Sequence, residues 1–275
     1  MKTWFITGAS SGFGRQLAET VLKYGDQCVL TARRPEQLAD LLTLYAHLAI
    51  ALPLDVTQPG QITPAIAAAK EKFGTLDVLV NNAGYGLLAA LEETDDARLE
   101  KNLQTNLVGP LRLMRAMIPI FREQKHGHII NITAAAAITN YAGFAIYGAA
   151  KAGLEAAAEA VAAECAPFGI KVTLVVPGPF RTDFISRSLD VPPHRPEYAV
   201  TVGKFETILK RMNGKQPGDP QKAAEAIYHI AGVEKPPLRL VLGKYARDKV
   251  AKKIKALGDE LAAWQSVGLP TDFTA

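Results

Sequence analysis

Short apolar runs alternate with longer segments over the first two-thirds of the chain, and in the longer segments apolar residues recur at helical spacing. The apolar runs predict strands at 3–7, 27–32, 48–55, 78–81, 128–133 and 171–176. The segments between them predict helices at 14–24, 35–45, 62–73, 98–122 and 147–166. Nearly continuous apolar strands that alternate with helices are typical of a parallel sheet covered on both faces. We therefore expect a doubly wound α/β fold.

The pattern changes after residue 177, where prolines, glycines and charged residues interrupt the alternation up to residue 220. We interpret 183–215 as a lid over the site, with a helix near 201–212. A helix at 221–231, a last strand at 238–241 and a charged C-terminal helix at 244–266 follow. Neither a composition break nor an internal repeat divides the sequence, so a single domain over 1–275 is expected.

Composition and charge exclude several classes of protein. The 275 residues are 48% hydrophobic with a formal net charge of +4, and the cations form no stripe of the kind that binds nucleic acid. No signal peptide and no apolar run of about 18 residues is found, so we expect a soluble, cytoplasmic protein without membrane contact. Cys28 and Cys165 fit neither a disulfide framework nor metal spacing, which predicts buried thiols and no metal site.

The turn after the first predicted strand reads Gly8-Ala9-Ser10-Ser11-Gly12-Phe13-Gly14 and leads directly into a helix. Glycines at such a turn let the backbone approach a diphosphate, and the helix N-terminus offers free N–H groups. A glycine turn that serves packing alone is the alternative. We expect Gly8, Ser10, Ser11, Gly12, Phe13 and Gly14 to bind the phosphates of a dinucleotide.

Two arginines, Arg33 and Arg34, follow the second predicted strand, where an NAD-binding protein would carry an acid for the ribose 2′-hydroxyl. Guanidinium groups suit a 2′-phosphate because they form charge-assisted, forked contacts with it. Solvated surface arginines are the alternative interpretation. The pair predicts NADP(H) rather than NAD(H).

Tyr147 and Lys151 open the Ala-rich helix one turn apart, so their side chains share a face. An ammonium beside a phenol favours the phenolate and lowers the phenol's pKa. Such a phenol could protonate a carbonyl during reduction or deprotonate an alcohol during oxidation. Taken alone, the pair could equally be a solvated helix face.

These motifs together resemble the short-chain dehydrogenases/reductases over about residues 3–185. Residues 7–14 match the family's Thr-Gly-x-x-x-Gly-x-Gly loop, residues 81–84 its Asn-Asn-Ala-Gly motif, and Tyr147 and Lys151 its catalytic pair. The resemblance implies a Rossmann fold and an oxidoreductase acting on a carbonyl or alcohol, frequently as a homo-oligomer. The arginines and the long segment after residue 177 resemble the branch near 17β-hydroxysteroid and retinol dehydrogenases.

The resemblance also implies roles for single residues. Asn106 would support a proton-relay water beside Lys151, which itself would bind the nicotinamide ribose. The other cofactor contacts that it implies are Asp55, Val56, Asn82, Ala83, Gly84, Tyr147, Pro177, Gly178 and Thr182. Phe144, Phe180, Phe184, Tyr198 and Phe205 could line a pocket for a hydrophobic substrate.

One position departs from the family pattern. Thirteen residues before Tyr147, where the family has a serine that holds the substrate oxygen, this chain has Ala134. Losing one such hydrogen-bond donor costs about 10²–10³ in turnover, which cripples an enzyme without abolishing its activity. The alanine could be an introduced inactivating substitution, or a natural residue replaced in its role by Thr133, Thr139 or Tyr141. Because Thr133 would point to the opposite face of its strand, we do not assign it a catalytic role.

The sequence therefore predicts an NADP(H)-dependent oxidoreductase that transfers a hydride between the nicotinamide and a small carbonyl or alcohol substrate, with Tyr147, Lys151 and Asn106 as catalytic residues. Two alternatives remain open. Because of Ala134, the chain could be a non-catalytic NADP(H)-binding sensor or scaffold. It could also catalyse an epimerisation or dehydration through a transient keto intermediate, without net use of the cofactor.

Overall fold

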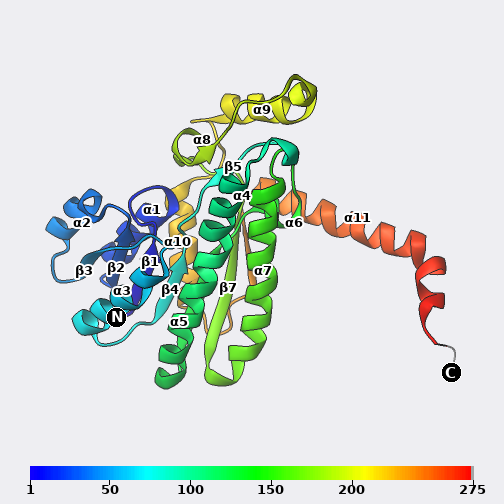
Figure 1. The fold of residues 1–275 in the computed structure, drawn as a ribbon. Helices are drawn as coiled ribbons and strands as arrows, with labels where there is room; N and C mark the ends of the chain where they lie inside the picture. The colour runs from blue at the N-terminus through cyan, green and yellow to red at the C-terminus, as the bar shows by residue number, and fades with distance from the viewer. Residues whose placement is uncertain (274–275) are drawn as a thin grey trace.

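Seven parallel strands form one sheet in the computed structural model, which describes residues 1–273 (Figure 1). Their order across the sheet is β3-β2-β1-β4-β6-β7-β9, so the chain winds outward from β1 in one direction and from β4 in the other. This confirms the doubly wound α/β fold. The strands are β1 Thr3–Thr7, β2 Gln27–Ala32, β3 Ala49–Pro53, β4 Val78–Asn81, β6 Gly127–Ile132, β7 Ile170–Pro177 and β9 Arg239–Leu242.

Helices cover both faces of the sheet. The helices α1 Gly12–Lys23, α2 Ala39–Leu44 and α10 Pro220–Ala231 pack on one face, where Leu17, Leu41 and Ile227 meet the strands. The helices on the other face are α3 Pro59–Phe73, α5 Gly109–Gln124 and α7 Ala145–Cys165.

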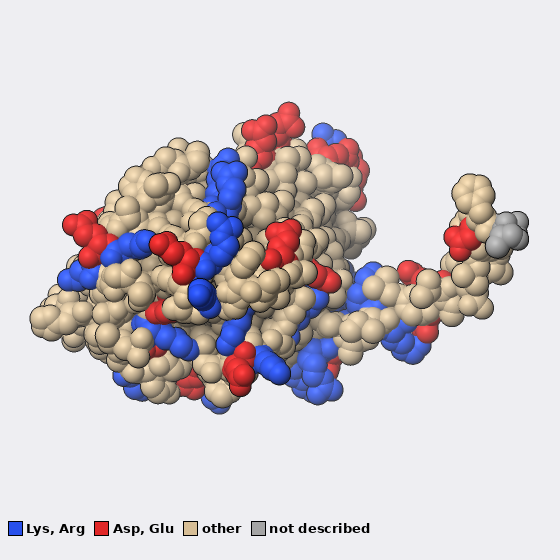
Figure 2. Space-filling model, turned by 90° about the horizontal axis from the view of Figure 1, so that it is seen from below, with Lys and Arg blue, Asp and Glu red and all other residues tan. Residues whose placement is uncertain are grey.

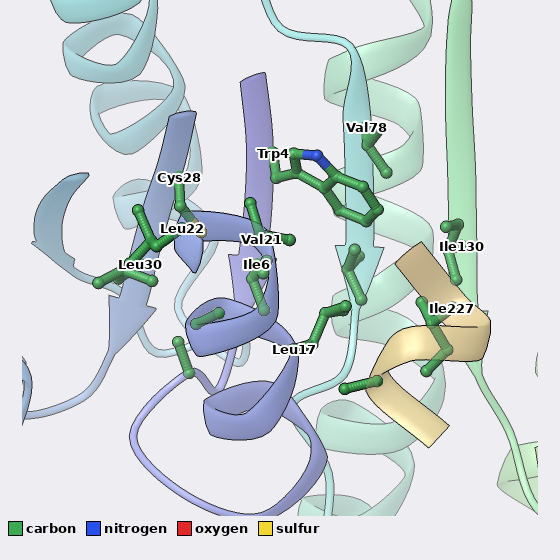
Figure 3. Packing of buried hydrophobic residues seen from close by; sticks show 14 of the residues in the cluster. Trp4, Ile6, Leu17, Val21, Leu22, Cys28, Leu30, Val78, Ile130 and Ile227 are labelled. Carbon is green, nitrogen blue, oxygen red and sulfur yellow. The ribbon is translucent and has the colours of Figure 1, made fainter. Parts of the chain in front are cut away.

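The two hydrophobic cores follow from the alternation of side chains along each strand. Trp4 and Ile6 point to the face with α1 and α10, as Figure 3 shows, whereas Phe5 between them packs in the other core. All three side chains are fully buried. Cys28 and Cys165 are free thiols, one in each core, which confirms that they are buried.

The predicted helix 98–122 is interrupted. It consists of α4 Asp96–Leu103, a π-helical turn Gln104–Val108, and α5. Within the turn, Asn106 Nδ2 donates to the carbonyl of Asn102 in α4 at 3.2 Å. Four residues on, Pro110 has no N–H with which to bond the Asn106 carbonyl. Such π turns are frequent at functional sites.

Short elements escaped the sequence pattern because they contain too few residues to show a period. They are α6 Ala135–Ile138, α8 Phe184–Arg187, and the strand pair β5 Gly86–Leu87 with β8 Leu189–Asp190. The predicted strand 48–55 is also shorter in the structure, because Leu48 lies in the turn before β3 and the last two residues lie in the loop after it.

The segment 183–215, which we call the lid, lies above the sheet in Figure 1 and contains α8 and α9 Lys204–Met212. The last helix, α11 Lys244–Gly268, extends well away from the body in the same view. Between residues 1 and 273, no helix combines the length and the apolar character needed to cross a membrane.

Candidate functional site

A cavity of about 790 Å³ opens at the carboxyl ends of the strands, between the sheet and the lid. It collects residues from five predicted motifs that lie far apart in the sequence. Of the predicted cofactor residues, only Gly14 and Arg34 lie outside its lining. Those that line it are Gly8, Ser10, Ser11, Gly12, Phe13, Arg33, Asp55, Val56, Asn82, Ala83, Gly84, Tyr147, Lys151, Pro177, Gly178 and Thr182.

The glycine loop is shaped for close backbone approach. Gly8 and Gly12 have φ angles of +66° and +55°, which side chains strongly disfavour. A Cβ atom on Gly14 would lie 2.4 Å from the Gly8 carbonyl oxygen, so Gly14 serves the packing of α1 against the loop rather than the cavity itself. The loop therefore presents backbone and the first turn of α1 to the cavity.

Asn82 and Thr7 hold this loop against the end of β4. The Asn82 Nδ2 atom donates to the carbonyls of Thr7 and Gly8 at 2.9 and 3.1 Å. In return, the Thr7 hydroxyl accepts the N–H groups of Asn82 and Ala83, each at 3.0 Å. The role of Thr7 was not predicted, although it begins the glycine motif.

The rim at β2 and β3 carries one cation and one acid. Arg33 is exposed and lines the cavity, whereas Arg34, also exposed, lies outside the lining. The Asp55 carboxylate accepts the backbone N–H and the hydroxyl of Thr57 at 2.9 and 2.7 Å, and Asp55 lines the cavity beside Val56. A single guanidinium, rather than two, thus faces the predicted 2′-phosphate site.

Lys151, Asn106 and Gly84 converge at the centre of the cavity. The Lys151 ammonium donates to the Ile132 carbonyl at 2.8 Å. The Asn106 amide donates to the Tyr85 carbonyl at 2.9 Å and accepts the Tyr85 N–H at 3.3 Å. A Cβ atom on Gly84 would lie 2.6 Å from Asn106 Oδ1 and 3.3 Å from Lys151 Nζ, so only glycine fits between them.

The protonation properties of Tyr147 and Lys151 differ from what their spacing predicts. Burial raises the pKa of the Tyr147 phenol above its ordinary value, and burial lowers the pKa of Lys151 to about 8. The expectation that Lys151 lowers the pKa of the phenol is therefore wrong for this state of the protein. The reason is that desolvation dominates both groups, while the ammonium bonds to the Ile132 carbonyl.

Ala134 lines the cavity at the start of α6, where its methyl group offers no donor. The Thr133 hydroxyl is occupied by Glu155 Oε1 and the Val175 carbonyl, each at 3.0 Å. Thr139 lies outside the cavity lining. Tyr141 does line it, and its hydroxyl lies 3.2 Å from that of Tyr245. Of the three suggested replacement donors, Thr133 and Tyr141 thus line the cavity, but the Thr133 hydroxyl already donates within the protein.

The half of the cavity beneath the lid is lined mainly by apolar side chains, together with Asp183, Arg187, Ser188 and Asp190. Phe144 packs edge-on against Tyr147, and Phe205 of α9 packs edge-on against Phe144, with centroid distances of 5.2 and 5.3 Å. Four of the five suggested aromatic residues line this half, whereas Tyr198 does not. The apolar lining includes Phe144, Phe180, Phe184, Leu189, Phe205, Ile208, Leu209 and Met212.

A buried carboxylate that the sequence did not indicate fastens the lid to the body. Glu93 accepts the N–H of Ala90 at 2.9 Å, the N–H of Arg195 at 2.5 Å and a His194 ring nitrogen at 3.1 Å. Burial alone would raise the pKa of Glu93, but these hydrogen bonds and the charge of His194 lower it overall. Nothing in the local sequence marks Glu93, because its lid partners lie about a hundred residues further along the chain.

Comparisons with known proteins agree with this geometry. Residues 2–190 match the family model for short chain dehydrogenase. An oxidoreductase, BOA17 of Botryotinia fuckeliana, is 36% identical over 269 residues, which cover 98% of each chain. The crystal structure of a short-chain dehydrogenase from Streptomyces avermitilis is 42% identical with a TM-score of 0.93, covering 99% of this chain and 100% of the other.

A serine dehydrogenase solved in a closed form with NADP⁺ is more distant. It is 26% identical with a TM-score of 0.74, and the match covers 87% of this chain and 94% of the other. The family model alone spans well over half of the sequence. The chain therefore belongs to the short-chain dehydrogenase family of oxidoreductases.

Proposed function

We propose that the protein is an NADP(H)-dependent oxidoreductase that interconverts a hydrophobic carbonyl compound and its secondary alcohol. The observation that carries this proposal is that Tyr147, Lys151 and the glycine loop line one cavity whose lid side is lined mainly by apolar side chains. Those are the parts that a reductase needs: a dinucleotide site, a proton donor and a pocket for the carbonyl.

The residues present fit a dinucleotide phosphate. Gly8 has a positive φ, and a Cβ atom there would lie 2.9 Å from Ala83 Cα, so the loop can admit no side chain where backbone must approach a diphosphate. The first turn of α1 faces the same space with its free N–H groups. Arg33 at the rim supplies a cation for a 2′-phosphate.

When bound, the nicotinamide supplies or accepts the hydride. Tyr147 donates a proton to the substrate oxygen during reduction, and its raised pKa keeps the phenol protonated for that step. Lys151 lies within the cavity to hold the cofactor ribose and to pass a proton toward Tyr147. Asn106 lies in the π turn, and its backbone carbonyl receives no hydrogen bond from Pro110, which has no N–H. This carbonyl can therefore accept a hydrogen bond from a water molecule of the proton relay.

The test is a screen of ketones and aldehydes with NADPH, in which the absorbance of the reduced nicotinamide measures turnover. Turnover should favour apolar substrates and fall by several orders of magnitude in Tyr147→Phe, which keeps the ring and removes the proton. Turnover that Tyr147→Phe leaves unchanged would refute the assigned mechanism.

The cofactor preference has its own test. Because Arg33 lines the cavity and Arg34 does not, Arg33→Ala should weaken NADPH binding by about tenfold to a hundredfold, at a charged contact worth about 1.5–3 kcal/mol. NADH binding should change little, and Arg34→Ala serves as the matched control. Equal losses for the two cofactors would contradict the NADP(H) assignment.

Ala134 favours a second candidate, a protein that binds NADP(H) without turning it over. It predicts tight NADPH binding and no oxidation of the cofactor with any substrate, even in Ala134→Ser. Turnover by either form of the protein would exclude this candidate.

A further inference from the structure

The distal part of α11 carries a stripe of exposed apolar side chains. Ile254, Leu257, Leu261 and Trp264 recur at intervals of three and four residues and expose 64%, 49%, 77% and 69% of their surfaces. That spacing is the seam of a coiled coil, which is stable only when a second helix covers it. Residues 251–273, which we name the arm, are exposed at all positions but Lys253.

The charges of the arm are separated along its length. From 251 to 256 the arm has three lysines and no acid, whereas from 257 to 273 it has three acids and neither lysine nor arginine. In Figure 2 the arm leaves the body with blue side chains near its base, and tan and red ones lie toward its free end. One end of the helix is therefore the electrostatic complement of the other.

We propose that the arm binds the arm of a second copy of this chain, with the two helices antiparallel. A twofold axis across the pair places the basic half of each arm beside the acidic half of the other, which no parallel arrangement does. A helix that lies on an anionic lipid surface would instead carry cations along its whole polar face. The acidic outer half argues against that occupant.

The sequence specifies one register for the pair. Ile254 then lies opposite the partner's Leu257, and Val250 opposite the partner's Leu261, so the apolar seams face each other over this stretch, while Trp264 lies opposite the partner's Arg247. On one flank Lys253 meets the partner's Glu260, an attractive pair of the kind that sets helix orientation. On the other flank Ala251 meets the partner's Gly258. A side chain at Gly258 would meet open space in the single chain, so this small residue is free to serve a close approach of helices.

The first test measures mass by sedimentation equilibrium at micromolar protein. Leu261→Lys places a charge in the seam, and the mass of the assembly should fall by a factor of two. Ser266→Lys adds the same charge on the far side of the helix, at another exposed position, and should leave the mass unchanged. A mass that Leu261→Lys does not change, or a wild-type chain that is monomeric, would overturn the proposal.

The second test fixes the direction of the helices. Ala251→Cys and Gly258→Cys chains are prepared separately, oxidised alone and then oxidised as a mixture; Cys28 and Cys165 are buried and do not interfere. The mixture should give a disulfide-linked dimer, whereas each chain alone should not, because seven residues along a helix separate the two positions by about 10 Å. Equal cross-linking of each chain with itself would show parallel arms and overturn the antiparallel pairing. Both tests are read without any substrate, so they do not depend on the proposed reaction.

Discussion

Ala134 and Tyr141 face the same cavity and bear on the same missing interaction. Residue 134 lacks the hydroxyl that the resemblance implies beside the substrate oxygen, and Tyr141 is the suggested substitute that lines the cavity without donating to Glu155 or Val175 as Thr133 does. If the Tyr141 hydroxyl supplies the donor, removing this hydroxyl should lower turnover most in the chain that has alanine at residue 134. The effects of substitutions at residues 134 and 141 on turnover can therefore be compared in one set of variants.

We expect Ala134→Ser to raise kcat by up to about 10²-fold, because one preorganised donor to the substrate oxygen contributes on that order. Tyr141→Phe should lower kcat in the Ala134 chain and have a smaller effect in the Ala134→Ser chain. Steady-state kinetics of the four proteins form a double-mutant cycle. Strictly additive effects would show that Tyr141 plays no part as a donor.

Lys151 links the candidate site to stability. Burial lowers its pKa from 10.5 to about 8, so the folded protein binds this proton more weakly than the unfolded chain does. The cost of the buried charge is complete below pH about 8 and disappears as the pH rises from there to about 10.5.

Replacing the ammonium with a neutral side chain should therefore stabilise the protein. We expect Lys151→Met to raise the free energy of unfolding at pH 7 by about 1–3 kcal/mol without cofactor, after allowance for the lost bond to Ile132. The gain should shrink toward pH 10, while turnover is lost at every pH. Urea unfolding of both proteins at pH 7 and 10 measures this, and a gain that grows with pH would contradict it.

The helices and strands long enough to show a regular spacing of apolar residues were predicted from the sequence, and most of their ends agree with the structure to within one or two residues. β1, β2 and β4 have the predicted bounds, because each is a buried apolar run between polar turns. The π turn was not predicted, since the side chain of Asn106 and the missing N–H of Pro110 alter a helix whose apolar spacing is otherwise regular. Propensity and pattern carry no information about such a local rearrangement.

The lid shows the same limit more strongly. Its existence follows from the prolines and glycines after residue 177, but its attachment depends on Glu93, a residue in a short turn before α4. The tyrosine pair at the mouth of the cavity joins residues 104 positions apart. Contacts between distant segments of this kind require the folded chain.

Removing the carboxylate of Glu93 should free the lid. In Glu93→Ala the N–H groups of Ala90 and Arg195 lose their acceptor, so we expect faster proteolysis within 191–215 and a KM for the carbonyl substrate raised several-fold. The Kd for NADPH should stay within about twofold, because Glu93 does not line the cavity. Glu100→Ala, at an exposed acid of α4, is the control. Unchanged proteolysis would exclude a fastening role.

For the molecule as a whole, the sequence motifs predicted which residues meet, because parallel strands bring their carboxyl ends to one edge of the sheet. The glycine loop, the asparagine motif and the Tyr–Lys pair all lie there. The sequence did not indicate that the last helix leaves the body. Its apolar positions could have packed against the sheet as readily as they project from it.

The arm should be dispensable for folding. A chain that ends at Val250 keeps the buried Ala246 and the cavity residue Tyr245, so at a dilution where the full chain is monomeric its free energy of unfolding and its Kd for NADPH should match those of the full chain. A chain that ends at Gly243 loses both and should be less stable. Equilibrium unfolding and cofactor titration of the two truncated proteins decide this; destabilisation by the shorter deletion would mean that the arm packs on the body.

The first turn of helix α11 lines the cavity, and the C-terminal part of the helix is exposed to solvent. Tyr245 in its first turn lines the cavity and meets Tyr141, and the same helix continues without a break into the arm. A ligand that moves this first turn would also move the arm, and so would change the free energy of the pairing that we propose between two arms. Thermodynamic reciprocity then requires that association of two chains change the affinity for that ligand by the same factor. Substrate affinity in this protein would thus vary with protein concentration, and a saturating substrate would shift the association constant.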